Sequence, residues 1–176
     1  MDNFHEEIVT KKNKTLDSIM YGVLIVIMAL AALITAFLLS TIMNGFSVPA
    51  LVIMLVSAGI AFLIWWKKDT LKTEYEYTIT NSDLEFARVM NNNKRKNLGQ
   101  MNLRKVEAMG FVAGNGFKRY ISMPGIKKHN WFLNPGANLF FLYYVKDGVK
   151  NIIIIEPSEK LAAMIKTYAQ QGVYVN

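Results

Sequence analysis

Side chains that could do chemistry are few in this sequence of 176 residues, and their arrangement does not indicate an active site. The two histidines, His5 and His129, lie far apart, and no carboxylate-rich cluster accompanies either of them. His129 directly follows Lys127 and Lys128, whose positive charge disfavours a metal cation, so we interpret it as an exposed loop histidine. The absence of cysteine excludes disulfides, thiolate metal sites and cysteine nucleophiles.

Acidic pairs and glycine motifs give no stronger signal. Glu74 and Glu76 share one face of a predicted strand, where they are either paired carboxylates or, as we interpret them, solvated strand residues. Gly114-x-Gly116 is too short for a dinucleotide-binding fingerprint, and neither a P-loop nor a G-x-S-x-G elbow is present. We therefore predict no catalytic, cofactor-binding or metal-binding residues and a protein that is not an enzyme.

Two long uncharged segments dominate the N-terminal third of the chain. Residues 19–43 and 45–66 carry no charge and are apolar on every helical face, whereas a surface helix has a single apolar stripe. About 20 such residues cross the hydrocarbon core of a bilayer. The alternatives are core helices of a soluble protein, which the rest of the chain is too short to cover, and a cleaved signal peptide, whose apolar run is shorter. We predict transmembrane spans at about 19–42 and 48–66.

The charges that flank these spans predict their orientation. Lysines precede the first span and follow the second, and the turn between the spans, which contains Asn44-Gly45 and Pro49, has none. Because Lys and Arg concentrate on the cytoplasmic side, we expect a multi-pass protein of the inner (plasma) membrane with both termini in the cytoplasm. Trp65 and Trp66 occupy positions typical of an interfacial aromatic belt.

Small residues within the spans allow close helix packing. These residues are Gly22, Ala29, Ala32, Ala36 and Gly59. We interpret them as the packing surface of the hairpin itself, although small residues also serve contacts with other membrane helices. Residues 1–18, which precede the hairpin, mix both charge signs and predict either a short interfacial helix or a disordered cytoplasmic segment.

Beyond the spans the apolar residues alternate, as they do in half-buried strands. Asp147-Gly148 between two aromatic and β-branched runs indicates a hairpin, and Ile152–Ile155 should be covered on both faces. Ser158 is a candidate N-cap of a final amphipathic helix that ends at Gly172. We expect residues 123–137 to be mostly loop and 172–176 to be a tail. Strands are expected near residues 74–80, 84–90, 97–101, 106–112, 117–122, 139–145 and 149–155.

The order of these elements, about seven strands and then a helix, resembles the pleckstrin-homology-like (PH-like) fold, a bent seven-stranded sheet closed by a C-terminal helix. The segments that carry the resemblance are Tyr77–Asn81, Leu84–Phe86, Lys94–Lys96, Met101–Val106 and Ile154–Glu159. They are similar to bacterial membrane proteins that place two spans before such a domain, and to an uncharacterised domain-of-unknown-function family from Gram-positive anaerobes. The resemblance implies a β-rich α+β cytoplasmic domain over residues 73–171 behind a transmembrane α-hairpin over residues 19–66.

Positive charge is concentrated in this domain and at its border with the hairpin. Residues 67–128 contain 13 Lys and Arg and six Asp and Glu, a difference equal to the chain's net charge of +7. The basic clusters are either solvated loop ends or a face that contacts anionic phospholipid headgroups. Eukaryotic PH domains bind inositol phosphates around the first hairpin loop, but Asn81-Ser82-Asp83 is neutral to acidic, so we do not expect phosphoinositide binding. The candidate membrane-surface contacts are Lys67, Lys68, Lys72, Trp65, Trp66, Lys94, Arg95 and Lys96.

Two functional hypotheses follow. In the first, the cytoplasmic domain is a docking module for proteins or for the bilayer surface, tethered by the hairpin. In the second, the protein is an accessory subunit of a membrane transporter or envelope-stress complex, and the hairpin is the interface. The expected partners are therefore the lipid bilayer, anionic headgroups, and a protein partner or a second copy of the chain. Nucleic acid is not expected, because the basic clusters lack regularly interleaved aromatic residues.

Overall fold

The computed structural model describes residues 4–175 of the chain. The chain forms two compact units. One is the helical hairpin, Asn13–Thr73, and the other combines the segment up to Lys12 with the chain from Glu74 onward. The hairpin is thus inserted into the sequence of the second unit.

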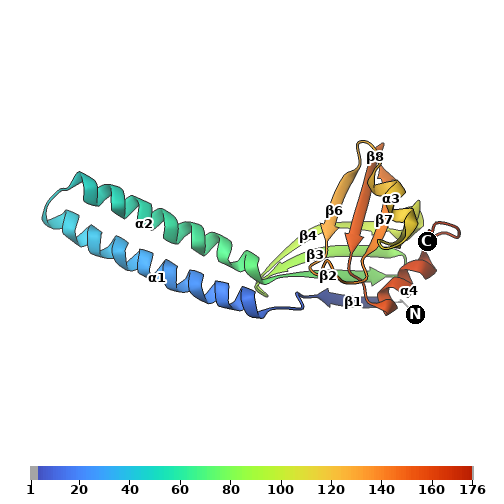
Figure 1. Ribbon diagram of the computed structural model, residues 1–176, viewed down its shortest axis with the longest axis horizontal. Coiled ribbons are helices and arrows are strands. Elements are labelled where there is room, and N and C mark those ends of the chain that lie inside the picture. Colours follow the sequence, from blue (N-terminus) through green and yellow to red (C-terminus); the bar gives the residue numbers. More distant parts are fainter. Residues whose placement is uncertain (1–3, 176) are drawn as a thin grey trace. The chain divides into compact units, whose positions relative to one another are not determined.

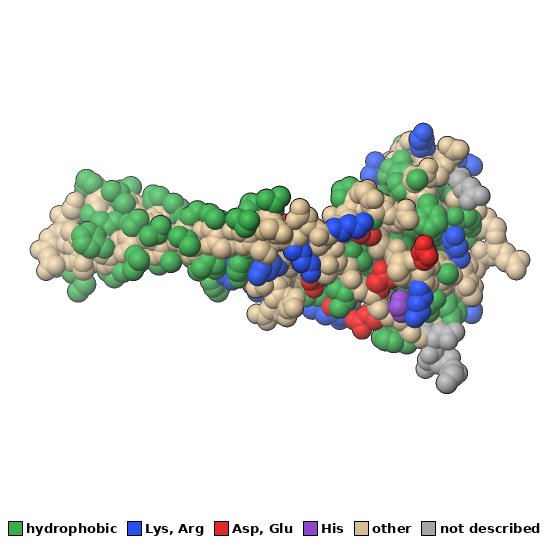
Figure 2. Space-filling model, turned by 60° about the horizontal axis from the view of Figure 1, so that its bottom comes forward, with side chains coloured by type: hydrophobic (Ala, Val, Ile, Leu, Met, Phe, Trp, Pro, Cys, Tyr) green, Lys and Arg blue, Asp and Glu red, His purple; other side chains and the backbone are tan. Residues whose placement is uncertain are grey.

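The hairpin consists of α1, Thr15–Asn44, and α2, Val48–Lys67, followed by the 3₁₀ turn η1, Lys68–Lys72. Figure 1 shows the two helices antiparallel and side by side. Both are long and apolar enough to cross a membrane. Figure 2 shows hydrophobic side chains along the visible surface of the hairpin. The two predicted apolar helices are therefore confirmed.

The buried residues of α1 and α2 are small, but they are not the predicted glycines. Ala31 and Ser57 are buried, and the Ser57 hydroxyl lies 2.8 Å from the hydroxyl of Thr35. A Cβ atom added to Gly22 or Gly59 would meet no atom of the described residues within 4 Å. The expectation that these two glycines line the packing surface of the hairpin is therefore wrong. The other predicted packing residues, Ala29, Ala32 and Ala36, are exposed as well.

The first sheet of the β-rich unit has the strand order β1-β2-β3-β4. Strand β1, Phe4–Val9, pairs with β2, Thr73–Thr80. The other two strands are β3, Asp83–Met90, and β4, Lys94–Asn102. The prediction that the N-terminal segment is helical or disordered is wrong for residues 4–9, and residues 1–3 lie outside the described part of the chain. The inward-facing residues of β1 include the polar His5 and Glu7. Because these positions are polar, the segment does not show the apolar alternation by which a half-buried strand is recognised in a sequence.

The second sheet has the order β5-β7-β8-β6. It contains β5, Ala108–Phe111; β6, Lys127–Trp131; β7, Phe140–Lys146; and β8, Val149–Ile155. The β7–β8 hairpin is confirmed. The strand predicted at residues 117–122 is instead helix α3, Asn115–Ile121, and the predicted loop at 123–137 contains β6. Phe117, Tyr120 and Ile121 have helical spacing, which places all three over the same apolar cluster.

The second sheet is covered on both faces, as the apolar run of β8 predicts. Ile153 and Ile155 belong to a core shared with the first sheet, whereas Ile152 and Ile154 belong to a second core beneath α3. All four are buried. This double coverage explains why the strand is apolar at consecutive positions.

The C-terminal helix α4, Glu159–Tyr168, packs Leu161 and Ile165 into the first core. The predicted cap is confirmed, because the Ser158 hydroxyl accepts a hydrogen bond from the Leu161 N–H at 3.2 Å. The helix ends before Gly172, earlier than predicted, and Gly172 has a φ of 83° in the following turn. The tail then bonds to the edge of β5, where the Met109 N–H donates to the Val173 carbonyl at 2.8 Å.

Candidate functional site

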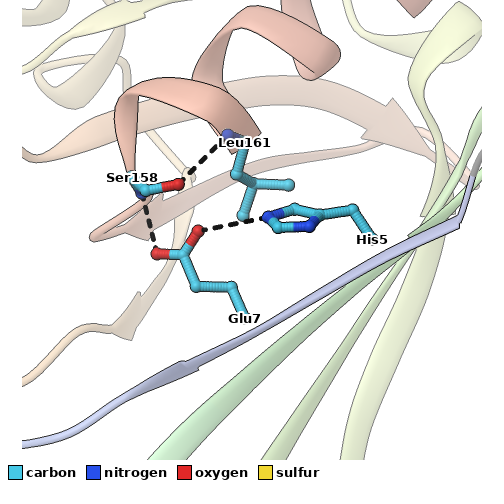
Figure 3. A network of polar contacts seen from close by, with 4 residues as sticks. All are labelled: His5, Glu7, Ser158 and Leu161. Atoms are coloured by element: carbon cyan, nitrogen blue, oxygen red, sulfur yellow. Dashed lines mark hydrogen bonds and ion pairs between the residues drawn. The ribbon is translucent and has the colours of Figure 1, made fainter.

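A polar network attaches β1 to the start of α4 (Figure 3). One Glu7 carboxylate oxygen accepts a hydrogen bond of 2.7 Å from the Ser158 backbone N–H. The other lies 3.9 Å from Nε2 of His5. A carboxylate at a helix N-terminus is favoured by the helix dipole, so Glu7 links the N-terminal strand to the C-terminal helix.

Asn134 holds the chain segment that leaves β1 towards the hairpin. Its side-chain oxygen accepts a hydrogen bond from the Lys12 N–H at 2.8 Å, and its amide nitrogen donates to the Thr10 carbonyl at 3.0 Å. The same nitrogen donates to the Glu156 carboxylate at 2.8 Å, and this carboxylate also accepts a 3.0 Å bond from the Asn134 N–H. Asn134 thereby fixes the strand exit to the end of β8.

Tyr77 completes the network inside the first core. Its hydroxyl donates to the Trp131 carbonyl and accepts from the Glu156 N–H at 3.3 Å. Burial raises the pKa of Tyr77 far above its usual range, so this phenol stays protonated. The hydrogen bonds of this network run to the backbone and between its own side chains, which is an architectural role.

The remaining titratable groups do not assemble into a catalytic or metal site. Among residues 4–175, no group of three or more His, Asp or Glu side chains could hold a metal ion. The interpretation of His129 as an exposed loop residue is wrong. It lies in β6, is half-buried, and its Nε2 atom is 3.3 Å from the Asn151 side-chain oxygen.

The candidate membrane contacts next to the hairpin differ in their surroundings. Trp65 and Trp66 are 58% and 57% exposed, and the Lys67 ammonium lies 4.9 Å from the centre of a Trp66 ring. Lys68 instead forms a 3.0 Å ion pair with Asp69. The Lys72 ammonium lies 4.1 Å above the ring of Tyr21, which is a cation–π geometry.

The predicted basic cluster Lys94-Arg95-Lys96 is divided between the two faces of the first sheet, because side chains alternate along β4. Arg95 donates a 2.6 Å hydrogen bond to the Glu76 carboxylate. This bond, together with the charges of Glu76, Glu6 and Glu85, raises the pKa of Arg95. Arg95 is therefore part of an acidic face, and only Lys94 and Lys96 point to the other side.

Sequence reasoning missed the residues of the polar network. Asn134 and Glu156 stand directly before the prolines of Asn134-Pro135-Gly136 and Glu156-Pro157-Ser158, and these motifs predict a loop and a helix start. A polar residue before each proline was the only local signal. Their shared role required knowledge of which segments meet in the fold.

A two-helix apolar hairpin and a PH-like β-rich unit with a C-terminal helix define the class of protein. Within this class the chain belongs to the family described as Bacterial PH-like domain (DUF6106), whose model matches residues 1–175. The match covers both units, so the hairpin is part of the family pattern. No curated protein and no solved structure matches the chain.

Proposed function

We propose that the protein is a non-enzymatic integral protein of the plasma membrane, with both termini in the cytoplasm, whose PH-like domain is a docking module held at the membrane surface. The observation that carries this proposal is the position of the hairpin between two paired strands. Val9 at the end of β1 is the register partner of Tyr75 at the start of β2. Two strands of one folded sheet must lie on one side of a membrane.

The pairing of β1 with β2 supports the topology independently of the charge distribution. The chain leaves the domain after β1, passes through both helices and returns at β2. The number of crossings must therefore be even, as two spans require. Lysines at both domain-proximal ends and their absence from the turn then favour the cytoplasm as the side that holds the domain.

The docking role is supported by charged side chains that are exposed on the surface of the domain. Lys94 and Lys96 are exposed at the start of β4. A tether of a few residues keeps such groups at high effective concentration near the leaflet. Basic residues near an anionic surface contribute about 1 kcal/mol each.

Cysteine accessibility tests the topology cleanly, because the chain has no cysteine of its own. We would compare Phe46→Cys in the turn between the helices, where Phe46 is 73% exposed, with Lys105→Cys in the domain. A membrane-impermeant maleimide should label position 46 in intact cells and position 105 only after the membrane is opened. Labelling of position 105 from outside would overturn the proposed orientation.

The second candidate function, an accessory subunit of a membrane complex, is favoured by the outward-facing glycines of the hairpin. Gly22 and Gly59 leave open surface where the backbone of another helix can approach closely. Native electrophoresis of gently solubilised membranes should then show a larger species that Gly22→Leu converts to the free protein. Migration of the unaltered protein only as a monomer would contradict this function.

A further inference from the structure

Two positively charged residues face each other directly across the β3–β4 ribbon. Arg88 and Lys96 are register partners in this antiparallel pair, so their side chains project from the same face. Lys94 shares that face because it lies two positions from Lys96. Like charges that stand directly opposite each other destabilise a sheet. On the other face of the ribbon, the positive charge of Arg95 is balanced by its ion pair with Glu76.

Arg88 provides a second observation. Its Nε atom is buried and has no hydrogen-bond acceptor among the described residues. A buried, charged donor without an acceptor is costly, and native structures seldom leave one unpaired. The cross-strand repulsion and the unpaired donor are independent observations, and an anion between Arg88 and Lys96 would relieve both.

The position of Arg88 and Lys96 in the domain indicates where such an anion would come from. Arg88 lies near the end of β3, whose neighbour β2 begins at Thr73, and Tyr75 of β2 is paired with Val9 of β1. Both connections to the hairpin leave the domain at this end of the sheet. Tyr75 is the third residue after Lys72, where η1 ends, a reach of about 10 Å in extended chain.

We propose that Arg88 and Lys96 bind the phosphate of an anionic phospholipid headgroup. The inference deepens the proposed function, on which it rests, by assigning the docking site and its ligand. A guanidinium fork and a neighbouring ammonium together match the several oxygens of a phosphate. The site lies on strands β3 and β4, away from the neutral loop at Asn81 and Ser82.

Native mass spectrometry of the detergent-solubilised full chain, titrated with phosphatidylglycerol, measures this binding. Arg88→Gln and Lys96→Gln should each weaken the affinity by about tenfold or more, the effect of losing a charge-assisted hydrogen bond. Arg95→Gln is the matched control, since it removes the same charge from the opposite face and should leave the affinity within about twofold. An equal loss in all three variants would overturn the proposal, because it would show only a response to net charge.

Two further binding measurements identify the ligand. Phosphatidylcholine should bind much more weakly than phosphatidylglycerol, and inorganic phosphate should not compete at millimolar concentration. Effective competition by inorganic phosphate would reassign the site to a free anion and refute the lipid.

Thermal unfolding without lipid separates binding from folding. Arg88→Gln relieves a like-charge pair, so its Tm should not fall, whereas a structural role for Arg88 predicts a lower Tm. Arg88→Lys keeps the charge without the fork and should bind at an intermediate level. Because the measurement is made in detergent, a wrong membrane orientation would appear only in the cysteine labelling and would leave these affinities unchanged.

Discussion

Strand β1 should be essential for the stability of the PH-like domain, although 63 residues separate its last residue, Val9, from β2 at Thr73. The perturbation compares two soluble versions of the domain. In the first, Lys12 is joined directly to Glu74, which leaves four residues between the paired Val9 and Tyr75, a normal hairpin loop length. The second begins at Thr73 and lacks β1. The first should fold as the full domain does.

The expected loss can be worked from the contacts that β1 makes. Burial of Val9 contributes about 1.5–3 kcal/mol, and the hydrogen bond from the Ser158 N–H to the Glu7 carboxylate contributes about 1.5–3 kcal/mol. The backbone hydrogen bonds between β1 and β2 stabilise the domain, whereas the conformational entropy lost when β1 becomes ordered destabilises it. We therefore expect the version without β1 to be less stable by at least about 3 kcal/mol, a large share of a domain's usual 5–15 kcal/mol.

Urea unfolding followed by tryptophan fluorescence measures this difference. Both versions lack Trp65 and Trp66, so Trp131, which packs against the first core, is their single reporter. With a slope of about 1–3 kcal/mol per molar urea, the midpoint should fall by roughly 1–3 M. Equal midpoints would refute the conclusion that the hairpin is an insertion between two strands of one sheet.

Three substitutions test other parts of the structure. Tyr77→Phe leaves two buried backbone partners without their bonds and should lower the unfolding free energy by about 1–3 kcal/mol in the same urea assay. Ser57→Ala removes the hydroxyl contact with Thr35 and should weaken the hairpin by about 0.6–1.7 kcal/mol in denaturation by a harsh detergent; no change would mean that the contact contributes nothing. Gly110→Ala places a Cβ atom against the Val175 carbonyl oxygen, closer than van der Waals contact allows, so the tail should leave β5 and become sensitive to carboxypeptidase. A tail that stays protected in this variant would contradict that close approach.

Much of the fold could be predicted because its signals are local. Uniform apolarity predicts the helices of the hairpin, since a bilayer or a protein core must surround every face of such a segment. The alternation at Tyr75, Tyr77 and Ile79 predicts β2, and the spacing of Leu161 and Ile165 with the Ser158 cap predicts α4. These patterns depend on residues a few positions apart, so the sequence determines them alone.

The candidate site was predicted only in part, because its properties depend on partners from distant segments. The sequence indicated Lys94, Arg95 and Lys96 as one basic cluster. In the fold, Arg95 of β4 forms an ion pair with Glu76 of β2, so the cluster loses its middle residue. This pair exists only once β2 and β4 have joined the same sheet. Likewise, β1 could not be recognised as a strand before its partner β2 was known.

The sequence by itself determined that this protein has an apolar helical hairpin, a β-rich domain and an excess of positive charge. The tertiary structure decided which charges meet. A register shift between Phe86 and Ala87 places Arg88 opposite Lys96, whereas an unbroken register would place it opposite Asn97. A one-residue slip moves side chains to the other face of a sheet. Gly99, which has a φ of 148° in β4, is a local signal of the β-bulge, but it does not determine which residues pair beyond it. For this reason only the folded ribbon revealed the pair of cations to which we assign the headgroup site.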